Sequence, residues 1–258
     1  MATSNNRTST KESTANTSTT DSKGETALHK ACRDGQTDHV KRLLQKGANP
    51  LATNNQNDTC LHITCFAGHL DILKILLKHV GWEKINVKGC FDFSLLHSAS
   101  IGGNVEIVRY LLQPDVGLNV FVGVKDMYGN SPIHQASEFG HVNVITELLK
   151  HFTIEEKGYI NMTPLLSACK SGSIEAVQFL LDQSADVTAK DDHGDTCIHW
   201  CCSEDGAEKK NSQEFVAFVE MLFAKGADVK AKNENSDTCL HYACQYGHFE
   251  LVKMLLTH

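Results

Sequence analysis

The 258-residue chain lacks the basic segments and long apolar segments that nucleic-acid-binding and membrane-spanning proteins need. No run of Lys or Arg is longer than two residues, and the net charge is −7 with a pI near 6.0. Nucleic-acid binding depends on clustered cations that release counterions from phosphates, so the chain is a poor candidate for it and we expect no nucleic-acid partner. No apolar stretch approaches the roughly 18 residues of a membrane-spanning helix, and the N-terminus has no apolar signal region. We therefore expect no membrane insertion and a cytoplasmic location, with the nucleus as an alternative.

The sequence also lacks the short motifs of the common enzyme classes. It contains no G-x-x-x-x-G-K-[ST] or G-x-G-x-x-G for phosphates, no H-E-x-x-H for zinc and no G-x-S-x-G. The chain has 14 histidines, but six of them fall in one column of an internal repeat and three more in another. We therefore expect that the chain has no enzyme activity and binds no cofactor.

The N-terminal segment has no aliphatic side chain larger than alanine over residues 2–23. Ser, Thr and Asn dominate it, so it cannot bury enough apolar surface to offset the entropy lost on ordering. We expect residues 1–23 to be a disordered tail and residues 24–258 to be the folded domain.

The rest of the chain is built from an internal repeat, and the repeat explains most of its individual motifs. Its anchor column is His in six units and Leu in the fifth: His29, His62, His97, His134, Leu166, His199 and His241. Every unit has Ser or Thr three residues before the anchor and Leu or Ile directly before it. Gly stands six residues after the anchor except in the sixth unit, where Asp205 breaks the column, and an apolar pair follows further on.

Each column has a physical interpretation. The Ser or Thr is typical of a helix N-cap, and the Gly is typical of a helix C-terminus. The later V-x-x-L-L pattern predicts a second amphipathic helix. Each unit is thus a helix–turn–helix that cannot bury its apolar face alone, so stacked neighbours must share one continuous core.

The pattern resembles the ankyrin repeat, whose signature is carried here by TALHKA (26–31), TCLHIT (59–64), SPIHQA (131–136), TCIHWC (196–201) and TCLHYA (238–243). The resemblance implies an all-α repeat solenoid of about seven stacked units with β-hairpin-like connecting loops. The units start near residues 24, 57, 92, 129, 161, 194 and 236. It also implies that the Thr hydroxyl and the His ring join the turns within and between units, except at Leu166.

The cysteines raise three alternatives: a metal site, disulfides or core packing. The stretch TCLHITC, with Cys60, His62 and Cys65 within six residues, looks like part of a zinc site. Zinc needs four converging ligands, however, and the resemblance already assigns the histidine to the turn. Nine of the ten cysteines occupy small-residue helix columns, and we expect those nine to be buried core residues. Cys90 alone stands in a loop, and we expect neither metal nor disulfide.

Several segments depart from the repeat. Residues 80–93 and 113–128 are longer than a usual connection, and we expect extended loops there. The sixth unit carries an insertion around residues 202–215, between its two helices. It is either a neutral surface loop or part of a partner site. The last unit ends with its second helix, so this helix frays or the natural chain continues past His258.

The resemblance implies a concave surface that recognises other proteins. Positions one, four and five after the anchor should face this groove. They supply aromatic and charged side chains of the kind that anchor interfaces: Arg33, Phe66, Glu138, Phe139, Lys170, Trp200, Tyr242, Gln245 and Tyr246. We expect Trp200 and Tyr242, at equivalent positions of adjacent units, to be neighbours that bind a partner or help to cover the stack.

Three functions fit this interpretation. The first is a monomeric, non-catalytic interaction module or scaffold that binds partner proteins. The second is the N-terminal regulatory or substrate-recruiting domain of a longer enzyme, channel or signalling protein. The third is a nuclear cofactor that holds a transcription factor. All three share one activity, protein binding.

Overall fold

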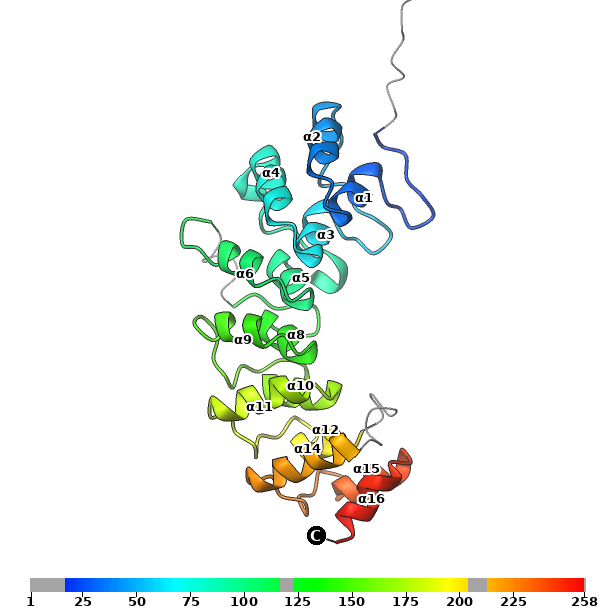
Figure 1. The fold of residues 1–258 in the computed structure, drawn as a ribbon, viewed down its shortest axis with the longest axis vertical. Coiled ribbons are helices and arrows are strands. Elements are labelled where there is room, and N and C mark those ends of the chain that lie inside the picture. Colours follow the sequence, from blue (N-terminus) through cyan, green and yellow to red (C-terminus); the bar gives the residue numbers. More distant parts are fainter. Residues whose placement is uncertain (1–16, 117–122, 204–212, 258) are drawn as a thin grey trace, which may run out of the picture.

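The computed structural model describes residues 17–116, 123–203 and 213–257, which form an elongated stack of helix pairs (Figure 1). The pairs follow one another along the stack in sequence order, as predicted for an all-α repeat solenoid. They are α1 (Ala27–Arg33) and α2 (Thr37–Gln45), α3 (Cys60–Ala67) and α4 (Leu70–Val80), α5 (Leu95–Ile101) and α6 (Val105–Leu111), α8 (Pro132–Glu138) and α9 (Val142–Leu148), α10 (Pro164–Ser171) and α11 (Ile174–Asp182), α12 (Cys197–Cys201) and α14 (Gln213–Ala224), and α15 (Cys239–Gln245) and α16 (Phe249–Leu255). No strand occurs in these three ranges.

The first helix of each unit begins after the predicted Ser or Thr. In α1 the Thr26 hydroxyl accepts the His29 backbone N–H over 3.3 Å, and the His29 Nδ1 atom accepts the Thr26 N–H over 3.1 Å. This reciprocal capping satisfies two of the donors that a helix N-terminus leaves open. At the other end, Gly68 follows α3 with φ 86° and Gly172 follows α10 with φ 70°, a left-handed conformation that favours glycine.

The histidine rings also join neighbouring units. The Nε2–H group of His29 donates to the Ala52 carbonyl over 3.0 Å, in the loop that leads to the second unit. The rings of His62, His97, His134 and His199 bond the carbonyl directly before the Ser or Thr cap of the next unit, in Phe93, Asn130, Met162 and Asp237. Leu166 has no polar side-chain atom, so the fifth unit has only the Thr163 hydroxyl cap on the Leu166 N–H. The role that the resemblance gave to the Thr and His columns is thus observed.

A single apolar core runs the length of the stack. The Leu or Ile before each anchor is buried in the first six units and partly buried in the seventh, at Leu240. Most members of the paired leucines are also buried, and these residues belong to one continuous cluster. Because each unit covers the face of its neighbour, the core extends with every added unit. No helix of the described ranges is long and apolar enough to cross a membrane.

The loops between units are hairpin-like turns built on an Asp or Asn. The Asp21 carboxylate accepts the N–H groups of Lys23 and Glu25 over 2.8 and 3.0 Å, and the Thr20 and Thr26 backbones form a β-bridge. Asn54, Asp126, Asp191 and Asn233 make the same pair of bonds in later units. Residues 20–23 therefore belong to the first hairpin and not to the predicted tail, whose residues 1–16 lie outside the described ranges.

The predicted irregular segments are more structured than expected. Residues 80–93 contain two short 3-10 helices, Trp82–Lys84 and Cys90–Asp92. Helix α14 already begins at Gln213, so the end of the predicted 202–215 insertion is helical. Residues 117–122 and 204–212, which hold the centres of the second loop and of the insertion, lie outside the described ranges.

The cysteines are free thiols, and eight of the nine assigned to the core are buried. Cys244 is the exception, and its predicted burial is wrong. It occupies the column that a following unit covers elsewhere in the stack, and α15 belongs to the last described unit. Cys90 lies half-buried in its loop, and the described residues contain no His, Cys, Asp or Glu group suited to a metal ion.

Candidate functional site

A row of aromatic rings runs along the hairpin tips of the third, fourth and fifth units. The Phe91 ring centroid lies 5.9 Å from that of Phe93 and 5.9 Å from that of Tyr128, and Tyr128 lies 6.0 Å from Tyr159. Phe91, Tyr128 and Tyr159 are each about half exposed to solvent. The row thus offers apolar ring surface where most loops carry polar side chains.

The backbone at Phe91 is strained. Phe91 and Asp92 have φ values of 50° and 61°, in the left-handed region. This conformation costs about 1–2 kcal/mol for a residue with a side chain, so glycine is usual there. An exposed phenylalanine at such a position contributes little to the core, and strain of this kind is frequent at binding sites.

Two hollows lie beside the aromatic row. The first, of about 400 Å³, lies between the second and third units and is walled by Phe66, Phe91 and Phe93. The second, of about 600 Å³, lies over the third to fifth units and adds Tyr128, Phe139 and Tyr159. Both hollows share Phe91, Phe93 and Ile101, so these three side chains form the rib between them. They make one groove with two depressions.

The charges around this groove are mostly engaged within the chain. The Arg33 guanidinium pairs with the buried Glu25 carboxylate, and this ion pair lowers the pKa of Glu25. Asp58 accepts the Cys90 N–H over 3.0 Å. The buried Asp126 carboxylate accepts two backbone N–H groups of its turn and the Gln135 amide over 3.2 Å. The groove therefore presents apolar surface with little charge available to a ligand.

A separate hollow of about 330 Å³ lies over the fifth to seventh units, where Trp200 and Tyr242 both line it, with Lys170 and Tyr246. The side chains of Trp200 and Tyr242 are each half-buried and hydrogen-bonded within the chain. The Trp200 indole N–H donates to Asp191 over 3.0 Å, and the Tyr242 hydroxyl lies 3.2 Å from both carboxylate oxygens of Asp195. Burial and the Asp195 charge raise the pKa of Tyr242 to about 12.

These bonds form a recurring contact that the sequence analysis missed. The residue directly after the anchor histidine bonds the hairpin Asp or Asn nine positions earlier in its own unit. The pairs are Lys30 with Asp21, Gln135 with Asp126, Trp200 with Asp191, and Tyr242 with Asn233. The constant spacing of nine residues between a polar-tipped side chain and an Asp or Asn is the signal that could have revealed it. Trp200 and Tyr242 therefore stabilise their units besides lining a hollow.

The structure divides the predicted groove residues into two sets. Phe66, Glu138, Phe139 and Lys170 line the aromatic groove, and Arg33 stands at its first hollow. The second set, Trp200, Tyr242 and Tyr246, lines the hollow over the fifth to seventh units. Lys170 belongs to both sets, because it also lies over the Trp200 ring, 5.6 Å from its centroid. Gln245 is exposed on α15 and borders neither hollow. Phe91, Phe93, Tyr128 and Tyr159 were not named in advance.

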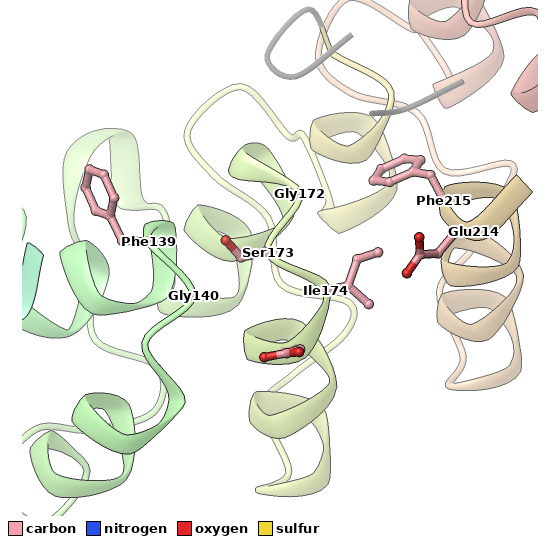
Figure 2. A pocket seen from close by; sticks show the side chains of 8 residues that line it. Phe139, Gly140, Gly172, Ser173, Ile174, Glu214 and Phe215 are labelled. Carbon is pink, nitrogen blue, oxygen red and sulfur yellow. The ribbon is translucent and has the colours of Figure 1, made fainter. Parts of the chain in front are cut away.

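Another depression, of about 610 Å³, lies between the starts of α11 and α14 (Figure 2). Ile174 points across it toward Glu214 and Phe215, whereas Phe139 stands at the far end of the view. This depression borders the junction of the fifth and sixth units, where Leu166 makes no histidine bond. Its lining of glycines, Ser173, Ile174, Phe215 and the carboxylates of Glu175 and Glu214 offers no paired acid, base or nucleophile arrangement.

Comparison with known proteins decides the family. A sequence model described as ankyrin repeats (3 copies) matches residues 1–89 and 81–158, and one described as ankyrin repeats (many copies) matches residues 165–205 and 207–256. This chain belongs to the ankyrin-repeat family. Ankyrin repeats imply protein–protein interaction. The crystal structure of the human ASB11 ankyrin repeat domain superposes with a TM-score of 0.69, covering 90% of this chain and 97% of that one at 24% identity, which supports the fold alone.

The curated relatives are much longer proteins of different kinds. A transient receptor potential cation channel subfamily A member 1 homolog of Caenorhabditis elegans is 37% identical over 98 residues, which are 38% of this ankyrin-repeat chain and 8% of the channel. The target of rapamycin complex 2 subunit AVO2 of Saccharomyces cerevisiae is 31% identical over 45% of this chain and 27% of its own length. The palmitoyltransferase AKR1 of Lachancea kluyveri is 27% identical over 67% of this chain and 19% of its own length. The chain thus spans at most about a quarter of these three relatives.

Proposed function

We propose that this chain is a non-catalytic protein-recognition module whose concave face binds partner proteins. The supporting observation is the groove of the second to fifth units, where five exposed aromatic side chains gather around two hollows: Phe66, Phe91, Tyr128, Phe139 and Tyr159. Aromatic anchors in desolvated pockets supply most of the binding energy at protein interfaces. The module acts as a monomer in the cytoplasm or nucleus.

Affinity capture with a matched variant pair tests this proposal. The tagged wild-type chain, a Phe66→Ala/Phe139→Ala variant and a Phe249→Ala variant are used to capture partners from cells. Phe249 is equally an exposed phenylalanine but lies on α16, away from the groove. Specific partners should be lost with the groove variant and kept with the α16 variant. Partners retained equally by all three chains would contradict the proposal.

A second candidate is that the module recruits partners or substrates for a catalytic or channel region of a longer protein. The observation that favours it is the small share of each curated relative that this chain covers, together with their names, a cation channel and a palmitoyltransferase. The intact mass of the endogenous protein, captured with an antibody to residues 24–258, distinguishes the candidates. A mass near 28.4 kDa supports the free-standing module, and a much larger mass supports the second candidate.

A further inference from the structure

The chemistry of the aromatic groove narrows the kind of partner it takes, if the proposed function holds. The groove is apolar along its length, and its charged groups already have partners within the chain: Arg33 with Glu25, and Asp126 with its own turn and Gln135. A ligand recognised through phosphate or through a basic cluster needs free counter-charges. The groove therefore favours an uncharged segment.

The same surface does not suit a ligand in the β conformation. A peptide that extends a sheet needs an exposed strand edge. The described ranges contain no strand, and the β-bridges recorded for them, Thr20 with Thr26 and Thr53 with Thr59, lie in the first two hairpin loops, N-terminal to the aromatic row. A ligand must therefore be held by side chains.

Two tyrosines supply the polar contacts. The hydroxyl groups of Tyr128 and Tyr159 have no hydrogen-bond partner among the residues that the structure describes, and both rings are exposed. A helical ligand has its carbonyl groups satisfied internally and offers these hydroxyl groups no free backbone acceptor. A polyproline II segment has no internal hydrogen bonds and presents its carbonyl groups outward. The tyrosines match the second kind of ligand.

The spacing of the repeats agrees with this conformation. The first hollow lies between the second and third units, the second lies over the third to fifth units, and they share the Phe91 and Phe93 rib. Packed helices of neighbouring repeats are about 8–10 Å apart. A polyproline II helix has three residues per turn and rises about 9 Å in that turn. Every third side chain therefore points the same way, one for each repeat, whereas a β-strand repeats its face about every 7 Å.

We propose that the groove of the second to fifth units binds a proline-containing segment of a partner protein in the polyproline II conformation, with an uncharged apolar side chain at every third position. One apolar side chain enters the hollow between Phe66 and Phe91. A later side chain on the same face of the segment enters the hollow between Phe93 and Phe139. The hydroxyl groups of Tyr128 and Tyr159 donate to carbonyl groups of the segment, and the exposed rings pack against its prolines.

Fluorescence anisotropy with synthetic peptides tests this proposal on the whole chain. The probe is a labelled peptide of four Leu-Pro-Pro triplets. One control has the same composition with the leucines grouped at one end, and another is an uncharged amphipathic helical peptide. The triplet peptide should bind at least about tenfold more tightly than either control, since a lost anchor side chain typically costs that factor.

Variants of the chain locate the contact. The Tyr128→Phe/Tyr159→Phe variant keeps both rings and should bind the triplet peptide about fivefold more weakly, because it lacks the hydroxyl donors. Phe139→Ala should weaken binding about tenfold, and Phe249→Ala should leave it unchanged. Circular dichroism of each variant checks that its helices are intact.

Three results overturn the inference: no binding of the triplet peptide up to about 1 mM, tighter binding of the helical peptide, or equal loss with Phe249→Ala. The capture experiment separates this failure from failure of the proposed function. If partners depend on Phe66 and Phe139 but the triplet peptide does not bind, the module recognises a different kind of segment. If neither partner capture nor peptide binding depends on the groove residues, both proposals are contradicted.

Discussion

His97 and Asn130 join the third and fourth repeats through one hydrogen bond, in which the His97 Nε2–H group donates to the Asn130 carbonyl over 3.0 Å. The other ring nitrogen, Nδ1, accepts the Ser94 backbone N–H over 3.2 Å. A nitrogen that accepts cannot carry a proton, so the ring has to be neutral. Burial is the main cause that lowers the pKa of His97 to about 4, and burial lowers the pKa of His29, His62 and His134 as well.

The first prediction is a loss of stability below neutral pH. An unfolded histidine takes up a proton near pH 6.5, whereas folded His97 resists protonation until about pH 4. Between these values the unfolded state binds more protons, so the free energy of unfolding falls as the pH falls. For His97 alone we expect a loss of about 1–2 kcal/mol between pH 7 and pH 5, measured by urea unfolding.

The control is His97→Leu, because Leu166 shows that leucine fits this column. This variant should be less stable at pH 7 and should lose less stability between pH 7 and pH 5. An unchanged pH dependence would contradict the neutral-histidine account.

The second prediction concerns the junction of the fifth and sixth repeats. Leu166→His should restore the missing bond, with the Asp195 carbonyl as acceptor, because Asp195 precedes its helix cap as Asn130 does. We expect a gain of about 1 kcal/mol, seen as slower hydrogen exchange in α12 and α14. A loss of stability would mean that the ring is buried without its acceptor and that the junction differs from the others.

The third prediction tests the contact nine residues apart. Tyr242→Phe removes the hydroxyl that lies 3.2 Å from Asp195 and from the Asn233 amide. The buried carboxylate then loses a donor, and we expect a cost of about 1–2 kcal/mol, confined to the last two repeats. The pKa of Tyr242 is raised to about 12. In a spectrophotometric titration of the variant, the tyrosine that ionises near pH 12 should therefore be absent. An unaltered titration would contradict the assignment.

The fourth prediction concerns thiol reactivity. Eight cysteines are buried, Cys90 is half-buried and Cys244 is exposed. A thiol reagent should therefore label Cys90 and Cys244 rapidly in the native chain and all ten cysteines after denaturation. In Cys244→Ser a single rapid thiol should remain. Rapid labelling of Cys60 or Cys197 would show that the core cysteines are accessible.

The sequence predicted the stack because its determinants are local. Thr26 and His29 cap their own helix and Gly35 follows it, and their spacing recurs, so seven weak signals support one another. The predicted burial of Cys244 was wrong because burial depends on whether a following unit covers the helix, which a column position alone does not reveal. The hairpin at residues 20–23 was missed because Asp21 holds it through hydrogen bonds and not through apolar burial.

The proposed binding groove was predictable from the sequence only in part. Phe66 and Phe139 follow from their helical columns. Phe91, Tyr128 and Tyr159 lie in hairpin tips, where the loops differ in length and the left-handed backbone of Phe91 has no side-chain signature. Their convergence into one row depends on how the units stack, with ring centroids 5.9 and 6.0 Å apart.

Oxidative footprinting of the chain with and without a captured partner tests the central claim most directly. Exposed aromatic rings are modified in the free chain, and rings covered by the partner are protected. The account predicts protection of Phe66, Phe91, Tyr128, Phe139 and Tyr159, with Phe249 modified equally in both states. Protection restricted to Phe249 and the outer helices, with the groove rings still modified, would contradict it.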